Sequence, residues 1–365
     1  MRNNAMQEQF VVSFCIPVYN NSEGAVKIVK ALLSSTDPRF EVVVSDDASS
    51  DNVGELLSGI SDFRFKYFRN DHNLGAHKNW LHSLELGTGR WVYLIMGRDM
   101  MSGQNIGRLI PLLEQAEQNG VLYLKDHGHY RDGLRISEGI DAMTNFVGYN
   151  HQTGEIFRRD NFMAIQEREH YFSIADMFPE NYAIRDLLLK GKGAFIHSGV
   201  VEGGFATDKS QVKSRVEYAA DIEKAYFAPP RKLKQFYEQI DMIDELPAGT
   251  FTDDERDAFF KSKYTTMLEH VSYWFRMWCR DSVQMAHYGQ PVRYIGIPEM
   301  VRNIFRAHRE TTAHLKDKGT YTFRRRLIMY WCTAKTAIKL SVKSMIRSII
   351  EPLGIWKILH YIRNY

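Results

Sequence analysis

The segment 41–52 reads EVVVSDDASSDN, a β-branched apolar run that ends in two acids and a turn rich in serine and aspartate. This pattern predicts a buried strand with Asp46 and Asp47 at its carboxyl end. A second segment of the same kind, WVYLIMGRDMM at 91–101, predicts another buried strand that ends in a Gly-Arg-Asp corner. Both strands therefore deliver charged side chains to one place in the fold.

Strand and helix patterns alternate around these two segments. Strands are predicted at 10–19, 40–45, 63–70 and 91–96, and helices at 23–35, 53–60 and 76–86. This βαβαβ order predicts an α/β fold of Rossmann-like type, with a mostly parallel sheet and helices on both faces. Such sheets bind ligands at the carboxyl ends of their strands, where the acids and Arg98 are expected.

The composition is that of a globular protein. The 365 residues are 44% hydrophobic and 25% charged, with a formal net charge of +3. Three widely spaced cysteines, Cys15, Cys279 and Cys332, argue against a disulfide framework or a zinc site. The polar start, MRNNAMQEQF, lacks the apolar core of a signal peptide, and no stretch approaches the roughly 20 apolar residues of a membrane span. These features predict a cytoplasmic protein.

A change in pattern divides the chain. Short strands and helices continue to about residue 225, and the segment FAPPRK (227–232) then places Pro229 and Pro230 where they interrupt a helix. Beyond them the pattern is almost entirely helical. We predict an α/β domain over 1–226 and an α-helical domain over 227–365.

Four segments occur in a recognisable order: CIPVYNN (15–21), VVVSDDASSDN (42–52), NDHNLGAHKNW (70–80) and GRWVYLIMGRDMM (89–101). Taken singly, each could be a plain turn or a helix cap. Together they resemble the amino-terminal half of family 2 glycosyltransferases, which have the GT-A fold. The resemblance covers about the first 100 residues well and extends loosely to about residue 200.

The resemblance implies that a nucleotide-diphosphate sugar binds at the strand ends. A carboxylate can accept the imide N–H of uracil or thymine, so Asp47, with Asp46 beside it, is expected against the base of a UDP- or dTDP-sugar. Pro17 and Tyr19 are expected along the face of the base, and Lys78 near the base or the phosphates. The donor-binding residues implied in this way are Pro17, Tyr19, Asn20, Asp46, Asp47, Lys78, Arg98 and Asp99.

In the family, an acidic cluster after the strand that corresponds to 91–96 holds Mg²⁺ or Mn²⁺ on the donor diphosphate. Here Met96 and Arg98 take the places of the first two acids, and Asp99 remains as a weak candidate metal ligand. A guanidinium can bind phosphate oxygens in bidentate fashion, so we expect Arg98 on the diphosphate and reduced or absent metal dependence. The alternative is that Arg98 pairs with Asp99 or another acid and points away.

An inverting transferase needs a base beside the acceptor hydroxyl. In this family the base is commonly the Asp of a Glu-Asp pair that opens a helix. The matching stretch, DMFPENYAIRDLLLKGKG (176–193), has Asn181 in the place of that Asp. Glu180 is therefore the expected base, with Asp176 as the second candidate. The alternative is that these acids only cap the helix.

A further segment, HQTGEIFRRDNF (151–162), resembles the family's Gly-x-x-Phe-Arg-Arg stretch near the acceptor. Gly154 would let the backbone come close to a ligand, and Arg158 could face a phosphate or an acid. We expect both residues on the acceptor side of the site.

The carboxyl-terminal region is strongly basic. Residues 321–365 contain nine Lys or Arg and one acid, and the segment 323–350 reads as an amphipathic helix with an aromatic start. Such a helix suits an anionic membrane surface. The alternative is packing on its own domain or in a homo-oligomer. Nucleic acid is not expected, because no recognised binding motif accompanies the charge.

The resemblance implies an enzyme that adds one sugar to a glycan or polyprenyl-linked acceptor in cell-surface polysaccharide synthesis, peripheral to the inner face of a bacterial membrane. The Gln-x-x-Arg-Trp motif and the transmembrane helices of the processive synthases do not occur in the sequence. The alternative is a catalytically inactive relative that binds a nucleotide sugar or serves as a scaffold, in keeping with Met96, Arg98 and Asn181.

Overall fold

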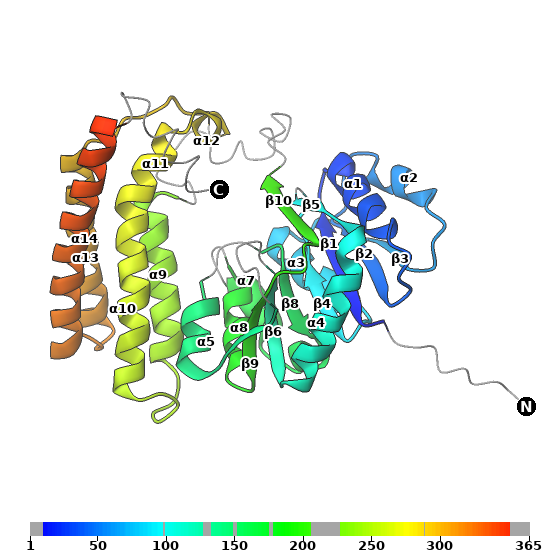
Figure 1. The fold of residues 1–365 in the computed structure, drawn as a ribbon, viewed down its shortest axis with the longest axis horizontal. Coiled ribbons are helices and arrows are strands. Elements are labelled where there is room, and N and C mark those ends of the chain that lie inside the picture. The colour runs from blue at the N-terminus through cyan, green and yellow to red at the C-terminus, as the bar shows by residue number, and fades with distance from the viewer. Residues whose placement is uncertain are drawn as a thin grey trace, which may run out of the picture. The chain divides into compact units, whose positions relative to one another are not determined.

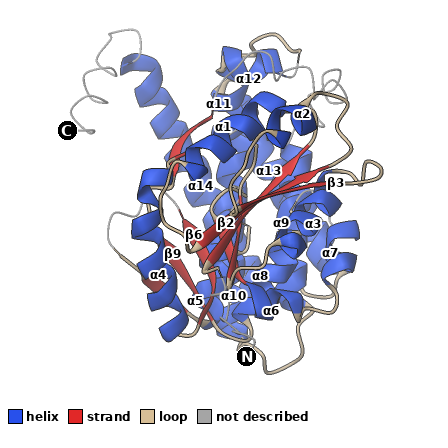
Figure 2. Ribbon diagram, turned by 90° about the vertical axis from the view of Figure 1, so that its right-hand side faces the viewer, coloured by secondary structure: helices blue, strands red, loops and turns tan. Residues whose placement is uncertain are grey.

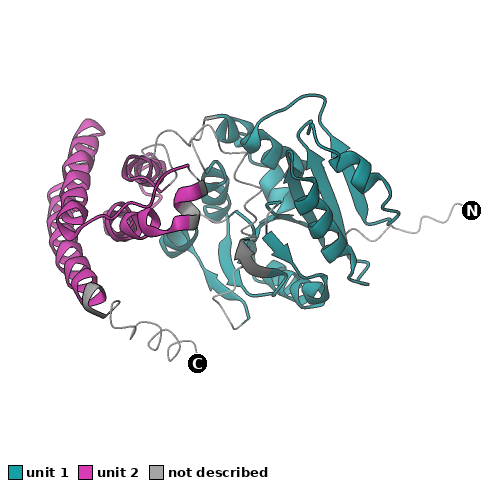
Figure 3. Cartoon of the chain, turned by 90° about the horizontal axis from the view of Figure 1, so that it is seen from above, with its two compact units in different colours: residues 1–207 teal, residues 208–365 magenta. Residues whose placement is uncertain are grey.

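The computed structural model describes residues 10–97, 99–126, 133–148, 152–174, 178–205, 227–287 and 289–350. The chain divides into two compact units, Met1–Thr207 and Asp208–Tyr365 (Figure 3). The boundary predicted at 226/227 stays a prediction, since residues 206–226 lie outside the described residues.

A mixed eight-stranded sheet forms the centre of the first unit (Figure 2). The strands, in their order across the sheet, are β3 (Phe65–Arg69), β2 (Phe40–Asp46), β1 (Val12–Val18), β4 (Trp91–Leu94), β8 (Glu155–Arg158), β6 (Val121–Asp126), β9 (Lys192–Ile196) and β7 (Arg135–Ser137). The three pairings from β3 to β4 are parallel, and β6 pairs with β9 in parallel as well. The predicted α/β fold with a mostly parallel sheet is confirmed.

Strand β8 runs against its neighbours. It is antiparallel to both β4 and β6, with Leu94 opposite Glu155 and Trp91 opposite Arg158. Glu155 at the start of β8 therefore lies at the edge where the parallel strands end, and Arg158 lies at the other edge.

Helices cover both faces of this sheet because its strands are apolar on both sides. Val12, Phe14 and Ile16 of β1 pack in a core with α1 and α4, while the residues between them face α3. The helices of this unit are α1 (Ser22–Leu33), α2 (Val53–Ser58), α3 (Ala76–Leu86), η1 (Gly103–Asn105), α4 (Ile106–Gln118), α5 (Gly139–Phe146), α6 (Arg159–Met163), α7 (Arg168–Ile174) and α8 (Glu180–Leu188).

A second, two-stranded sheet lies beside the end of β4. Strand β5 (Asp99–Met101) pairs antiparallel with β10 (Val201–Phe205), and Asp99 is opposite Phe205. This pairing holds Asp99 and Met101 against a segment 100 or more residues further along the chain.

The described part of the second unit is helical, as predicted, and α9, α10, α13 and α14 lie side by side in it (Figure 1). Its helices are α9 (Pro229–Asp244), α10 (Asp253–Glu269), the π-helical turn η4 (His270–Trp274), α11 (Phe275–Arg280), α12 (Ser282–His287), α13 (Ile297–Asp317) and α14 (Phe323–Ile350). Buried Arg325 links three of them by pairing with Asp244 of α9 and Asp257 of α10. Within the described residues, no helix has the length and apolar content that a membrane span requires.

Candidate functional site

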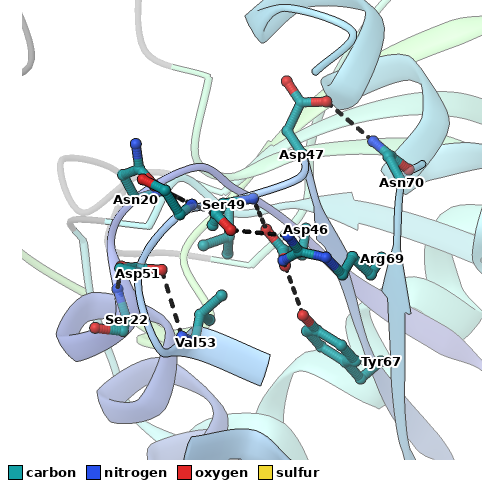
Figure 4. A network of polar contacts seen from close by, with 12 residues as sticks. Asn20, Ser22, Asp46, Asp47, Ser49, Asp51, Val53, Tyr67, Arg69 and Asn70 are labelled. Atoms are coloured by element: carbon teal, nitrogen blue, oxygen red, sulfur yellow. Dashed lines mark hydrogen bonds and ion pairs between the residues drawn. The ribbon is translucent and has the colours of Figure 1, made fainter. Parts of the chain in front are cut away.

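The loops that follow β1 and β2 are tied together at the carboxyl edge of the sheet. Asn20 and Ala48 both have left-handed backbones, with φ of 49° and 55°. The Asn20 N–H donates to Ser49 Oγ at 2.9 Å, and Asn20 Oδ1 accepts from the Ser50 N–H at 2.7 Å (Figure 4). Strained backbone held by such cross-links is typical of binding sites. Asn20, predicted to contact the donor, thus also fixes the shape of the edge.

Asp46 lies at the end of β2 and is fully buried. Its carboxylate accepts from the Ser49 N–H at 2.9 Å, from Tyr67 Oη at 2.5 Å and from Arg69 at 2.7 Å (Figure 4). Burial by itself would raise the pKa of Asp46, but the hydrogen bonds from Ser49, Tyr67 and Arg69 outweigh it and hold the pKa below its usual value. Asp46 is therefore an ionised anchor between β2 and β3.

Asp47 points the other way, towards the loop before α3 (Figure 4). Its carboxylate accepts from Asn70 Nδ2 at 3.0 Å, from the Leu74 N–H at 2.7 Å and from the Gly75 N–H at 3.0 Å. A carboxylate has about four acceptor positions, so these donors orient Asp47 and leave capacity for one more.

Tyr19 is a predicted donor residue that follows β1 at the point where Asp47 follows β2. The Asp47 N–H donates to the carbonyl oxygen of Val18, which precedes Tyr19. The Tyr19 side chain is 53% exposed, while Pro17 is buried within β1. Lys78 is exposed in the first turn of α3. The structure thus brings together Tyr19, Asp47 and the amino-terminal end of α3.

The next group of residues lies where β4 ends. Thr153 Oγ1 donates to Asp99 Oδ2 and accepts from the Met96 N–H at 2.8 Å. The carbonyl oxygen of Thr153 accepts from buried Lys125 Nζ at 3.0 Å. Thr153 therefore connects Asp99 with β4 and β6. Arg98, the residue expected on the diphosphate, lies outside the described residues.

Glu180, the first residue of α8, belongs to a buried cluster with Glu155 and Lys125. Lys125 Nζ is 4.0 Å from Glu155 Oε1, and both side chains are fully buried. Glu180 is 1% exposed, and neither of its carboxylate oxygens has a well-formed hydrogen bond to a described residue.

Burial dominates the ionisation of this cluster. It raises the pKa of Glu180 to about 8, against the opposing influence of Lys125 and the nearby Gln152 amide. The pKa of Glu155 is also raised, first by burial and then by the negative charge of Glu180. Burial lowers the pKa of Lys125, although Glu155 and Glu180 oppose that change. At neutral pH the carboxyl groups of Glu155 and Glu180 therefore share one proton, which removes the repulsion between two buried negative charges.

The two residues predicted on the acceptor side, Gly154 and Arg158, lie at opposite edges of the sheet. Gly154 has a φ of +90°, and a Cβ there would lie 2.3 Å from the carbonyl oxygen of Asp126, so only glycine fits. Arg158 lies at the opposite edge of the sheet, paired with Glu117 at 2.7 Å. The structure therefore does not place Arg158 with the other predicted residues. Asp176, the second candidate base, lies outside the described residues.

Three residues of this edge were not among those predicted from the sequence: Lys125, Thr153 and Glu155. A lysine and an aspartate at the end of the apolar run 121–124 were an available signal for a strand end with polar function. Nothing local distinguished Thr153 or Glu155, because their partners come from β4, β6 and α8.

The capacity of this edge to bind a metal rests on few groups. Within the described ranges, no group of three or more His, Cys, Asp or Glu side chains has the arrangement of a metal site. Asp99 is the described carboxylate at the position of the family's acidic cluster, and Thr153 occupies one of its oxygens. An ion there would take most of its ligands from phosphate oxygens and water.

A family model described as Glycosyl transferase family 2 matches residues 13–175. Abequosyltransferase RfbV of Salmonella typhimurium is 28% identical over 150 residues, which are 37% of this chain and 44% of that protein. Succinoglycan biosynthesis protein ExoO of Rhizobium meliloti is 27% identical over 116 residues, 32% of each protein. The chain thus spans less than half the length of these curated relatives.

A likeness in three dimensions covers more of the chain. The crystal structure of S. aureus TarS 1-349 matches with a TM-score of 0.51 and 12% identity, over 92% of this chain and 91% of that one. At such low identity the likeness concerns the fold, which is of the GT-A type. Residues 13–175 of this chain therefore match a glycosyl transferase family 2 domain.

Proposed function

We propose that this chain transfers one sugar, with inversion, from a UDP- or dTDP-sugar to a glycan or lipid-linked acceptor in cell-surface polysaccharide synthesis. The observation that carries the proposal is the orientation of Asp47 by Asn70 and two backbone N–H groups at the carboxyl edge of β2. An oriented carboxylate with one acceptor position left suits the imide N–H of a pyrimidine. The exposed ring of Tyr19 beside it suits the face of the base.

The relatives support this donor and pathway. S. aureus TarS, which shares the fold, has been crystallised with UDP and with UDP-GlcNAc. RfbV is named as an abequosyltransferase and ExoO as a succinoglycan biosynthesis protein. A pyrimidine nucleotide sugar and a polysaccharide product are therefore the first substrates to test.

Glu180 is the proposed base. The acceptor oxygen attacks the anomeric carbon as the bond from that carbon to the diphosphate breaks, and the acceptor proton passes to the Glu180 carboxylate. The leaving diphosphate takes the bonding electron pair. Since the pKa of Glu180 is raised to about 8, the ionised fraction, and with it the transfer rate, should rise between pH 6 and 8. Asp176 remains the second proposed base.

We propose that Arg98 binds the diphosphate of the donor, with Asp99 beside it as the candidate metal ligand. Met96 and Arg98 stand where the family has acids, so the guanidinium would supply much of the positive charge and metal dependence would be reduced. Transfer that persists in excess EDTA supports this proposal. Complete loss of transfer in EDTA, restored by Mn²⁺ or Mg²⁺, would contradict it.

Donor binding can be tested by calorimetric titration of UDP and dTDP into the wild type and Asp47→Asn. Losing a hydrogen bond to a charged group costs about 1.5 to 3 kcal/mol, so affinity should fall roughly 10- to 100-fold. Asp71→Asn, which changes an exposed acid in the 70–75 loop that donates to Asp47, is the matched control and should bind like the wild type. Equal affinity of Asp47→Asn and the wild type for UDP and dTDP would contradict the proposed donor site.

Transfer is tested separately, with radiolabelled donors and a membrane lipid extract. Glu180→Gln should bind UDP normally and lose transfer, whereas Glu55→Gln, an exposed acid in the first turn of α2, should retain it. Binding without any transfer by the wild type would instead favour a catalytically inactive relative, the alternative that Asn181 keeps open.

A further inference from the structure

Helix α14 has a buried face and, on the opposite side, an exposed apolar face. Successive residues of a helix turn by about 100°, so Arg325, Met329, Cys332, Thr336 and Leu340 share one face, and these residues are buried. The opposite face carries large apolar side chains that are 45–72% exposed. This α14 apolar face consists of Phe323, Leu327, Trp331, Ile338, Val342 and Met345. Contiguous exposed apolar surface of this kind marks an interaction site.

A basic pocket lies between α13 and the start of α14. It has a volume of about 410 Å³, and its lining includes Arg309, Lys316 and Arg326, together with Tyr321 and Tyr330. The described residues that line it include no carboxylate. Among the residues that the structure describes, none of the three cations has a carboxylate within 4.0 Å, although Lys316 and Arg326 each lie over a tyrosine ring. A pocket with three unneutralised cations is suited to a phosphate group.

The pocket and the α14 apolar face are continuous. Tyr330 lines the pocket, is itself 52% exposed, and precedes Trp331 of the apolar face. No acidic residue occurs between 323 and 350, while Lys335 is exposed beside the apolar residues and lies over the Trp331 ring. The surface therefore combines apolar side chains, aromatic rings and positive charge along one helix.

We propose that this surface docks on an anionic phospholipid layer, with a lipid phosphate in the basic pocket and the α14 apolar face at the boundary of the acyl chains. Charge complementarity favours this occupant over a second copy of the chain. In a two-fold dimer the same surface would meet itself, so that the uncompensated cations of both copies would come together. A lipid layer supplies the opposite charge and the apolar phase at once.

The test uses the full chain and vesicle flotation. Phosphatidylcholine vesicles are compared with vesicles that also contain phosphatidylglycerol. We expect binding to the mixed vesicles only, weakened as salt rises from about 0.1 M to about 1 M and the Debye length falls from roughly 10 Å to 3 Å. Equal binding to both vesicle types, or binding to neither, would overturn the proposal.

Two variants separate the components. Arg309→Gln/Arg326→Gln should bind mixed vesicles about 30-fold more weakly, since each cation near an anionic surface contributes about fivefold. Leu327→Ser/Ile338→Ser should weaken binding at least about tenfold through lost apolar burial. The control Lys30→Gln/Lys190→Gln removes two exposed charges from the first unit and should bind like the wild type. All these side chains are exposed or line the pocket, so unchanged thermal melts should confirm that the variants fold.

Other occupants give other results. Sedimentation velocity that shows a dimer, lost in Leu327→Ser/Ile338→Ser, with no vesicle binding, would assign the face to a second copy and overturn the proposal. Thermal stabilisation by inorganic phosphate that depends on Arg309 and Arg326, again without vesicle binding, would assign the pocket to a free phosphate compound and also overturn it. Wild-type behaviour of both double variants on mixed vesicles would equally refute it.

Discussion

Replacing Glu180 by Gln should make the first unit more stable at neutral pH while abolishing transfer. The Glu180 carboxyl group is 1% exposed and its pKa is raised to about 8, whereas the unfolded value is 4.5. The folded chain therefore keeps a proton that the unfolded chain releases, and the free energy of unfolding falls as pH rises from about 4.5 to about 8. Gln keeps the shape of the protonated acid but does not titrate.

The size of the effect follows from the two pKa values. With 1.36 kcal/mol per pH unit, the ionisable carboxyl group costs the folded wild type about 1 kcal/mol at pH 5, about 3 kcal/mol at pH 7 and about 4 kcal/mol at pH 8. Glu155 titrates together with Glu180, and Lys125 opposes both, so this shift belongs to the cluster. For a unit of this size 1 kcal/mol corresponds to roughly 2–4 °C in Tm, so the variant should gain roughly 10 °C on the wild type between pH 5 and 8.

The assay is thermal melting of both proteins at intervals from pH 5 to pH 8. A constant offset between Glu180→Gln and the wild type is not informative, because the new amide makes its own contacts. The change of that offset with pH is the measurement. Glu55→Gln makes the same chemical change in the first turn of α2, where the side chain is exposed, and should show no such trend. An offset for Glu180→Gln that stays flat, or that shrinks as pH rises, would refute the reasoning.

Three further predictions concern single contacts. Arg325→Met, which leaves Asp244 buried without its partner, should destabilise the second unit by about 3–5 kcal/mol in urea unfolding; a change below 1 kcal/mol would contradict this. Thr153→Val, which removes the hydroxyl that donates to Asp99, should raise KM for the donor about tenfold, and Thr153→Ser should restore it; equal KM for both variants would argue against this role. Gly154→Ala should lower the Tm of the first unit by several degrees, because φ is +90° and the new methyl group meets a carbonyl oxygen of β6; an unchanged Tm would show that the loop adapts.

Local pattern was sufficient for much of this molecule. The runs at 10–19, 40–45 and 91–96 predict strands because buried parallel strands are continuously apolar. Strands β1 and β4 lie within the first and last of these ranges, and β2 extends one residue beyond its range, to Asp46. The helix over 323–350 was likewise predicted from the periodicity of its apolar and basic residues. Asp46 and Asp47 could be placed at a ligand edge because a parallel strand and its end are set by neighbouring residues.

Local patterns did not predict which distant residues contact each other in the folded chain. Asp46 and Asp47 are adjacent in sequence and looked equivalent, yet the pleat turns one towards Arg69 and the other towards Gly75. Strand β8 runs antiparallel, which removes Arg158 to the far edge of the sheet.

Lys125, Glu155 and Glu180 come from β6, β8 and α8, and each alone is an ordinary charged residue. Their pKa values change because three separate elements bury them together, and burial is a property of the folded chain rather than of any segment. Residue type and spacing therefore specified the strands, the helices and the edge that carries polar groups. Packing of distant elements specified which of those groups are oriented, which are neutralised and which face solvent, because solvation and hydrogen bonding depend on neighbours that the chain supplies only when it is folded.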